Sequence, residues 1–179
     1  MHGCLRALPL FITRSYMSNP LIVTLKMDEK SQAFFDVKRR AYFPPERNFL
    51  EAHLMVFHHL PNTEETRSFL KAFRFPRFVA KATGLMKLGR GVAYRVECAE
   101  IKQLHQLLAK HFYAVLSAQD RQGYRPHVTI QNKVNLETAR LLFDALNNNF
   151  ESFNVGIQAI QVFSYMSGPW QHEFDVDLI

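Results

Sequence analysis

The chain carries an internal repeat, and this feature most strongly limits the folds that it can adopt. Its first half follows the order strand, helix, proline break, strand and helix, at residues 20–27, 31–41, 44–45, 51–61 and 62–73. Its second half repeats this order, with a polar loop at the break, at 91–99, 101–112, 118–126, 127–134 and 135–146. Each half then ends in strand-like sequence around glycine. A duplication explains this order and predicts two lobes related by a pseudo-dyad, with repeat units at about 20–90 and 91–179.

The helices predicted at 62–73 and 135–146 give the repeat its residue-level match. Laid over each other without a gap, they are identical at Asn62 and Asn135, Glu64 and Glu137, Arg67 and Arg140, and Ala72 and Ala145. This alignment predicts that Asn62 caps the first helix, with Glu65 completing a capping box. The earlier helix is expected to pack through the face formed by Ala33, Phe34, Val37 and Ala41.

A histidine and a hydroxyl lie side by side in the strand predicted at 127–134. Successive side chains alternate between the faces of a strand, so His127 and Thr129 share one face with Gln131. Alone, this His-x-Thr pattern is a weak signal, because a chain with eight histidines is expected to contain about one by chance.

The repeat predicts where a partner for His127 lies. The two predicted helix caps are 73 residues apart, and the same step back from His127 reaches Leu54, next to His53. A difference of one residue in loop length brings the two histidines into register. A pseudo-dyad would place their imidazoles face to face across a cleft, roughly 5 to 8 Å apart, where they can flank one phosphorus atom.

Two opposed histidines suit substitution at phosphorus. Imidazole titrates near neutrality, so a neutral ring can act as general base while a protonated ring acts as general acid. A nearby hydroxyl can hydrogen-bond a non-bridging phosphate oxygen. This chemistry requires neither a metal nor a cofactor, and the sequence lacks the carboxylate clusters of two-metal phosphoesterases.

Four stretches of the chain carry a resemblance to a known family: HLMVFHHLP at 53–61, GRGVAY at 89–94, RPHVTIQNKV at 125–134 and GPW at 168–170. With them, the chain from about Pro20 to its end resembles the two-histidine (2H) phosphoesterase superfamily, in its 2'-5' RNA ligase-like and cyclic phosphodiesterase branch. That family has two His-x-Thr/Ser motifs on strands of two pseudo-symmetric lobes. HVTI matches the motif fully, whereas HLMV has Met55 in place of the hydroxyl residue.

The resemblance implies an α+β fold of two antiparallel-sheet lobes around a basic cleft. It also implies hydrolysis of 2',3'-cyclic phosphates of nucleotides or RNA ends to 2'-phosphates, and relatives also cut or join 2'-5' linkages. Position by position, His53 and His127 become the acid/base pair and Thr129 a ligand of a phosphate oxygen. Met55 cannot take the second hydroxyl role, which removes one hydrogen bond to a charged group, worth about 1.5 to 3 kcal/mol.

Other residues are candidates for contacts with substrate. Arg125, Gln131 and Lys133 share the strand parity of His127, so each is a candidate for a phosphate contact, with Lys133 favoured. Met55, beside His53, is counted with them as a substrate contact.

The other histidines and two large aromatic residues receive mainly structural assignments. We expect His58 at the edge of the core and His59 at the cleft rim, and His105 and His111 on a helix as surface or packing residues. A metal site is disfavoured, because alternation turns His58 away from His53 and no Cys or acidic ligand completes a set. Trp170 and Tyr94 are expected in the core, with base stacking as the alternative.

Positive charge is concentrated between Thr66 and Val96, a segment that contains no Asp or Glu. Its eight cationic residues alternate with phenylalanines and are Arg67, Lys71, Arg74, Arg77, Lys81, Lys87, Arg90 and Arg95. A uniform sign over this length suggests a phosphate-bearing partner, and a solvated helix face is the alternative.

The remaining features concern the setting of the domain. Cys4 and Cys98 are too few for a disulfide framework, which favours a reducing, cytoplasmic compartment. Residues 1–19 are expected to form a loose extension, with a transit peptide or a start at Met17 as alternatives. Residues 20–179 are expected to form one bilobal domain, which we expect to be a monomer without a membrane partner.

Three functions stay open at this point. The first is a metal-independent cyclic phosphodiesterase acting on nucleotides or RNA ends. The second uses the same chemistry in reverse, as a 2'-5' RNA ligase. The third, suggested by Met55, is a module that binds RNA with little or no turnover.

Overall fold

The fold is α+β, as predicted. The computed structural model describes residues 19–179 and contains four α-helices and a seven-stranded sheet. The strands are β1 (Leu21–Met27), β2 (Leu54–Leu60), β3 (Phe78–Lys87), β4 (Val92–Glu97), β5 (His127–Gln131), β6 (Phe153–Tyr165) and β7 (Trp170–Asp177). The helices are α1 (Glu29–Tyr42), α2 (Glu64–Ala72), α3 (Ala99–Phe112) and α4 (Leu136–Asn147), with 3₁₀ turns at Pro45–Arg47 and Tyr113–Val115.

The antiparallel sheet is divided into two lobes by its longest strand, β6. Strand order is β1-β2-β5-β4-β3-β6-β7, and β6 also pairs with β1. The first part of β6, Phe153–Ile157, pairs with β3, while its later part pairs with β1 on one side and β7 on the other. One lobe therefore consists of β2, β1, β6 and β7, and the other of β5, β4, β3 and β6. We call them the β1 lobe and the β4 lobe.

The two repeat units exchange their third strands. Elements β1-α1-β2-α2-β3 and β4-α3-β5-α4-β6 follow the same order, as the sequence predicted. However, β3 of the first unit pairs with β4 of the second, and β6 of the second pairs with β1 of the first. The units at 20–90 and 91–179 therefore do not coincide with the lobes. Hydrophobic periodicity shows which face of a strand is buried, but it does not show which strand lies beside it.

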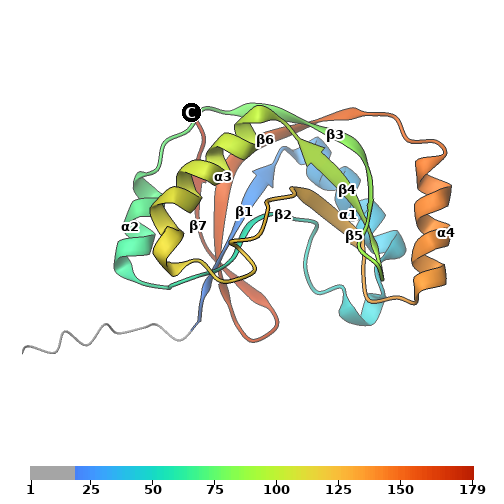
Figure 1. Cartoon of the computed structure of the whole chain (residues 1–179), viewed down its shortest axis with the longest axis horizontal. Coiled ribbons are helices and arrows are strands. Elements are labelled where there is room, and N and C mark those ends of the chain that lie inside the picture. The colour runs from blue at the N-terminus through green and yellow to red at the C-terminus, as the bar shows by residue number, and fades with distance from the viewer. Residues whose placement is uncertain (1–18) are drawn as a thin grey trace, which may run out of the picture.

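Helices α1 and α3 each pack on the lobe that contains the first strand of the other repeat unit. In Figure 1, α2 and α3 lie at one end of the molecule and α1 and α4 at the other. In α1, the rings of Phe34 and Phe35 lie with centroids 5.7 and 5.6 Å from that of Tyr94 in β4. In α3, the ring of His105 stacks 5.1 Å from that of Phe57 in β2. Each lobe thus receives a helix from the other repeat unit.

Helix α1 buries a different face from the one predicted. Its buried residues are Ser31, Phe35 and Arg39. Of the predicted face, Phe34 is partly buried against the core, whereas Val37 is 56% exposed and Ala33 and Ala41 lie at the surface. The apolar pattern does not reveal this face, because one of its buried residues is Arg39, whose guanidinium makes hydrogen bonds to the Leu50 and Thr129 carbonyl oxygens. A buried arginine with hydrogen-bond partners shifts the apparent apolar stripe around the helix.

The predicted cap of α2 was wrong by one residue. Thr63, not Asn62, is the N-cap and accepts a hydrogen bond from the Thr66 backbone N–H. Asn62 is buried and instead donates to the Asn19 carbonyl and accepts from Arg67. Asn135 caps α4 as predicted. The caps are therefore 72 residues apart, so the gapless match of the two helices does not describe equivalent positions.

The predicted N-terminal extension lies, apart from Asn19, outside the described residues. Cys4 lies there too, while Cys98 is a free thiol whose sulfur accepts a hydrogen bond at the start of α3. Within residues 19–179, none of the helices combines the length and the apolar character needed to cross a membrane.

Candidate active site

Strands β2 and β5 meet at a single residue pair, Leu54 and Val128. Continuing this antiparallel register by one residue each way places His53 opposite Thr129 and Met55 opposite His127. All four side chains then lie on the face opposite to that of the buried Leu54 and Val128. The two motif segments therefore form one cluster, in which the histidines are diagonal neighbours, with Cα atoms expected to be about 7 to 8 Å apart.

Both histidines are held by the same kind of backbone contact. His53 Nδ1 lies 2.9 Å from the Glu51 carbonyl oxygen, and His127 Nδ1 lies 2.7 Å from that of Arg125. Because a carbonyl oxygen can only accept, each Nδ1 carries the hydrogen. In the neutral form of each ring the free Nε2 is then the basic nitrogen. The two repeat units thus share the tautomer of the histidine, with the hydrogen on Nδ1, as well as the histidine itself.

The two strands also share an irregularity that sequence alternation could not show. Val56 and Phe57 are both buried in β2, and Ile130 and Gln131 are both buried in β5, at positions 74 residues apart. Pairing registers shift at these points, as expected for β-bulges. A bulge reverses the alternation, so residues after it face the other way.

The bulges decide which residues reach the site. Five predicted residues, His53, Met55, Arg125, His127 and Thr129, line one cavity of about 460 Å³. Gln131 and Lys133 are not among its lining residues. Gln131 is buried, with an Oε1 that has no hydrogen-bond partner among the described residues, and Lys133 follows the strand with a φ of 60°. In their place, the dyad-related His58 and Asn132 line the cavity.

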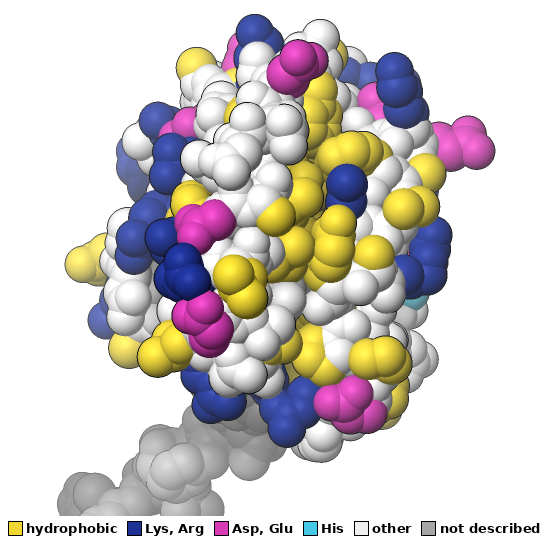
Figure 2. All heavy atoms as spheres, turned by 90° about the vertical axis from the view of Figure 1, so that its right-hand side faces the viewer, with side chains coloured by type: hydrophobic (Ala, Val, Ile, Leu, Met, Phe, Trp, Pro, Cys, Tyr) yellow, Lys and Arg dark blue, Asp and Glu magenta, His cyan; other side chains and the backbone are white. Residues whose placement is uncertain are grey.

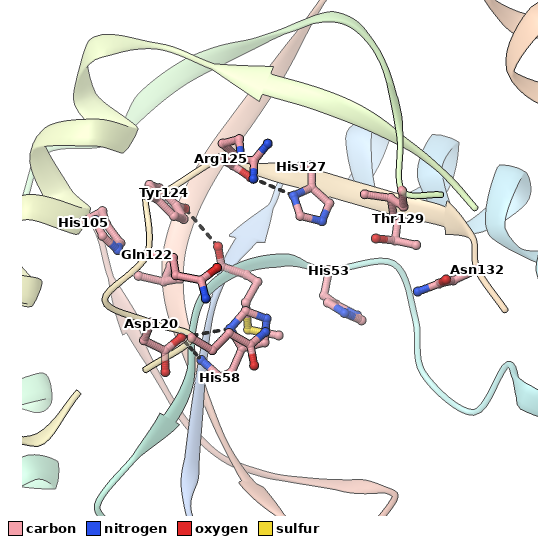
Figure 3. A pocket seen from close by; sticks show the side chains of 15 residues that line it. His53, His58, His105, Asp120, Gln122, Tyr124, Arg125, His127, Thr129 and Asn132 are labelled. Atoms are coloured by element: carbon pink, nitrogen blue, oxygen red, sulfur yellow. Dashed lines mark hydrogen bonds and ion pairs between the residues drawn. The ribbon is translucent and has the colours of Figure 1, made fainter. Parts of the chain in front are cut away.

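His58 is not a core-edge residue, as predicted from alternation, but a wall of the cavity (Figure 3). Its Nδ1 lies 2.9 Å from Asp120 Oδ1, and the backbone N–H groups of His58 and His59 also donate to this carboxylate. Ser117 donates to the second oxygen. Although burial raises the pKa of Asp120, the hydrogen bonds from His58 and Ser117 hold it below its usual value. His59 itself is exposed and lies outside this cavity.

The end of the cavity near α3 is formed by stacked rings. His105 lies parallel to Tyr124, with centroids 3.9 Å apart, and burial lowers the His105 pKa. The Tyr124 hydroxyl donates to the Met55 carbonyl oxygen at 2.9 Å. This bond fixes the backbone beside the first histidine independently of the Met55 side chain. Tyr124 and Asp120 lie in the loop before β5, which the sequence showed only as polar and glycine-containing.

Arg39 is a site residue that the sequence did not reveal. Its Nη1 donates to the Thr129 carbonyl oxygen at 2.9 Å, and its Nε donates to Leu50 O and Asn48 Oδ1. It therefore joins β5 to the loop that precedes His53. On the same helix, Asp36 accepts from the Ala52 backbone N–H at 2.7 Å. Helix α1 thus holds the chain on both sides of the motif pair, although it is distant in sequence from His127.

Both imidazoles favour the neutral form in the free protein. Burial lowers the pKa of His53 to about 4 against the hydrogen bond to Glu51, and the positive charge of Arg39 lowers this pKa further. Burial also lowers the pKa of His127, opposed by the hydrogen bond to Arg125. A bound phosphate anion would raise both values, because it stabilises an imidazolium.

Comparison with known proteins places the chain in a family. Residues 27–169 match the model of the 2'-5' RNA ligase superfamily. The chain belongs to the 2'-5' RNA ligase superfamily. The family predicted from the motifs is therefore confirmed.

Solved structures share the fold of this superfamily member. E. coli LigT in complex with 3'-AMP aligns with a TM-score of 0.60 at 14% identity, over 89% of this chain and 98% of LigT. TT0787 of Thermus thermophilus aligns with a TM-score of 0.55 at 12% identity, over 89% and 97% of the two chains. At these identities the likeness concerns the fold. No curated protein matches the sequence.

Positive charge in this 2'-5' RNA ligase superfamily member is not gathered at the cavity. Among the described residues, Arg125 is the only Lys or Arg that lines it. The cationic segment from Thr66 to Val96 contributes none. Four of its residues contact other parts of the chain: Arg67 with Glu173, Arg77 with Leu178, Lys87 with Phe143 and Arg90 with Val134. On the face shown in Figure 2, Lys and Arg lie mainly toward the margins of a hydrophobic band.

Two further assignments are settled by the structure. Tyr94 is buried, as expected, but Trp170 is only partly buried and its ring centroid lies 4.7 Å from that of His53. Trp170 therefore belongs to the surroundings of the site.

Within residues 19–179, no group of three or more His, Cys, Asp or Glu residues is placed to hold a metal ion.

Proposed function

We propose that this protein is a phosphodiesterase that opens 2',3'-cyclic phosphates of nucleotides or RNA ends to 2'-phosphates, without a metal. One observation carries the proposal. Two histidines on one cavity are held by matched Nδ1–H to carbonyl bonds, which leave both Nε2 atoms free for proton transfer. Their diagonal arrangement suits attack and departure on opposite sides of one phosphorus atom.

The proposed step involves two proton transfers. His53, whose pKa is about 4, acts as general base and takes a proton from water as the water oxygen bonds to phosphorus. His127, in its protonated form, donates its Nε2 proton to the 3' oxygen as the bond from phosphorus to that oxygen breaks. The product is a 2'-phosphate and a free 3' hydroxyl. The same transfers in the same direction, with an RNA hydroxyl in place of water as the nucleophile, would join ends through a 2'-5' linkage, and their reverse would cut that linkage.

Two more cavity residues are suited to the phosphate. Thr129 is opposite His53 across the strand pair, so its hydroxyl can donate to a non-bridging oxygen. Arg125 is exposed at the cavity and, among the residues of the described chain, carries the only lysine or arginine charge there. LigT, which has the same fold, has been crystallised with 3'-AMP, with ATP and with phosphate. These complexes support a nucleotide substrate for the present protein.

The pH profile tests this assignment of roles. Turnover requires one neutral and one protonated histidine, and both pKa values lie below the usual value of about 6.5. We therefore expect kcat/KM for a 2',3'-cyclic nucleotide in EDTA to be greatest below pH ~6.5 and to fall as the pH rises, because the protonated form is lost. The bound phosphate should shift the profile of kcat toward higher pH.

The measurement needs initial rates from about pH 4 to about pH 9, with the product isomer identified by chromatography. Complete dependence on an added divalent cation would contradict the mechanism. A 3'-phosphate product would reverse the roles of the two ribose oxygens. A kcat/KM that rises from about pH 6 to about pH 8 would show that neither histidine has a lowered pKa.

Met55 supports a second candidate function, an RNA-binding module with little or no turnover. Its side chain lines the cavity at the position where the other motif has Thr129. A thioether cannot donate a hydrogen bond to a phosphate oxygen. Both histidines are also biased toward the neutral form in the free protein, which weakens general acid catalysis at neutral pH.

The substitution Met55→Thr decides between the two functions. For a working enzyme, the added hydroxyl should raise kcat/KM by about tenfold, equivalent to about 1.4 kcal/mol of transition-state stabilisation. Met55→Val is the matched control, because it has the same branched shape without the hydroxyl. The backbone bond from Tyr124 to Met55 is preserved in both variants.

Other outcomes have distinct meanings. If neither wild type nor Met55→Thr turns over, while both bind RNA more weakly at higher salt, the protein is a binding module. If Met55→Thr and Met55→Val lose activity equally, the thioether itself contacts the ribose or base.

A further inference from the structure

A second cavity adjoins the first at His53. It has a volume of about 220 Å³ and extends along the β1 lobe, away from His58 and Asp120. His53 lines both cavities, so its imidazole lies where they meet. A substrate held at the two histidines can therefore extend into this second space.

Its floor is a row of side chains that crosses the β1 lobe. Thr24 of β1 pairs with Met55 of β2 on one side and with Gln161 of β6 on the other. Directly paired residues share a face of the sheet, so the row continues the face that bears the histidines. Thr24 and Gln161 both line the second cavity. Thr24 is 1% exposed, and its Oγ1 has no hydrogen-bond partner among the described residues.

Its walls are aromatic. Trp170, at the start of β7, lies with its ring centroid 4.7 Å from that of His53 and 5.7 Å from that of Phe163. Phe49, from the loop before β2, also lines this cavity and is 77% exposed, which is unusual for so large an apolar side chain. Flat rings thus surround a floor that offers a hydroxyl and an amide.

We propose that this second cavity binds the nucleobase of the nucleotide whose phosphate lies between His53 and His127. A base has apolar faces that stack on aromatic rings and polar edges that need hydrogen-bond partners. The walls match the faces, and Gln161 with the unpartnered Thr24 hydroxyl matches the edge, within the part of the chain that the structure describes. This inference rests on the proposed function for the position of the phosphate. It explains why Trp170 is at the site and not in the core.

Intrinsic fluorescence tests the base subsite without turnover, because Trp170 is the only tryptophan of the chain. A nucleoside 2'-monophosphate should quench this fluorescence saturably, whereas inorganic phosphate and ribose 2-phosphate should not. Phe49→Ala should weaken the nucleotide affinity by about tenfold. Equal quenching by ribose 2-phosphate, or none by the nucleotide at saturation, would overturn the subsite.

Kinetics add a test of specificity. The ratio of kcat/KM for a 2',3'-cyclic nucleotide to that for base-free ribose 2,3-cyclic phosphate should fall about tenfold in Phe49→Ala and in Trp170→Ala. Tyr165→Ala is the control, because Tyr165 is an exposed aromatic residue of the same hairpin that lines neither cavity. A Trp170→Ala variant that loses both activities equally would show that the ring acts only through His53.

The two proposals can fail separately. If wild type hydrolyses neither cyclic substrate, the phosphodiesterase assignment is wrong, while the fluorescence titration still decides the base subsite. If it hydrolyses both substrates equally and no nucleotide quenches Trp170, the enzyme assignment stands and the base subsite is wrong.

Discussion

Replacing His127 by alanine should lower kcat/KM for a 2',3'-cyclic nucleotide by about 10²-fold or more, because the leaving oxygen then departs without a proton donor. His53→Ala should cause a loss of similar size by removing the base. The two losses should not multiply in the double variant, since the histidines act as a pair in one step. Steady-state rates of the four proteins at one pH provide the measurement.

The matched control is His59→Ala. His59 follows His58 in β2, is exposed and does not line the cavity, so its removal should leave kcat/KM unchanged. Thermal unfolding of each variant shows whether the fold is retained. A folded His127→Ala protein with full activity would exclude the mechanism, whatever the geometry of the cavity.

Replacing Arg39 by methionine should lower the free energy of unfolding by about 2 to 4 kcal/mol. The side chain keeps its apolar length but loses its hydrogen bonds to Thr129 O, Leu50 O and Asn48. The partly buried carbonyl groups of Thr129 and Leu50 would lose the cationic donor that they accept from, which carries a cost for each. Urea unfolding measures the loss.

The same helix supplies the control for this experiment. Arg40 is exposed, so Arg40→Met should change the unfolding free energy by less than about 0.5 kcal/mol. Arg39 also lowers the His53 pKa through its charge. Its loss should therefore raise this pKa and move the acidic limb of the kcat/KM profile to higher pH. Equal stability of wild type and Arg39→Met would show that the loop before His53 is held by other contacts.

Much of the fold could be predicted because its signals are local. Strand and helix patterns recur within short windows, and the duplicated order identified His53 as the counterpart of His127 without knowledge of the sheet. The cap error at Asn62 and the wrong face of α1 arose where a polar residue is buried. In each case a long-range partner, Asn19 for Asn62 and Thr129 for Arg39, compensates the burial.

The outer residues of the site could not be predicted from alternation. A β-bulge in each motif strand turns Gln131 into the core and His58 toward the cavity. Simple alternation along each strand predicts the opposite for both residues. Asp120 and Trp170 come from a loop and a hairpin whose positions depend on tertiary packing. Only the cluster on the near side of the bulges, from His53 to Met55 and from Arg125 to Thr129, follows from the strand period.

The exchange of third strands between the repeat units has a consequence for how the two halves depend on each other. Separated at about residue 90, neither half would contain the neighbour that completes its lobe, and both would expose unpaired strand edges. The arrangement is that of a strand-swapped homodimer whose two subunits have become one chain. The paired histidines then occupy what would be the subunit interface, on either side of its twofold axis. Covalent fusion frees the two copies of a symmetric site to diverge, and Met55, at the position equivalent to Thr129, is such a divergence.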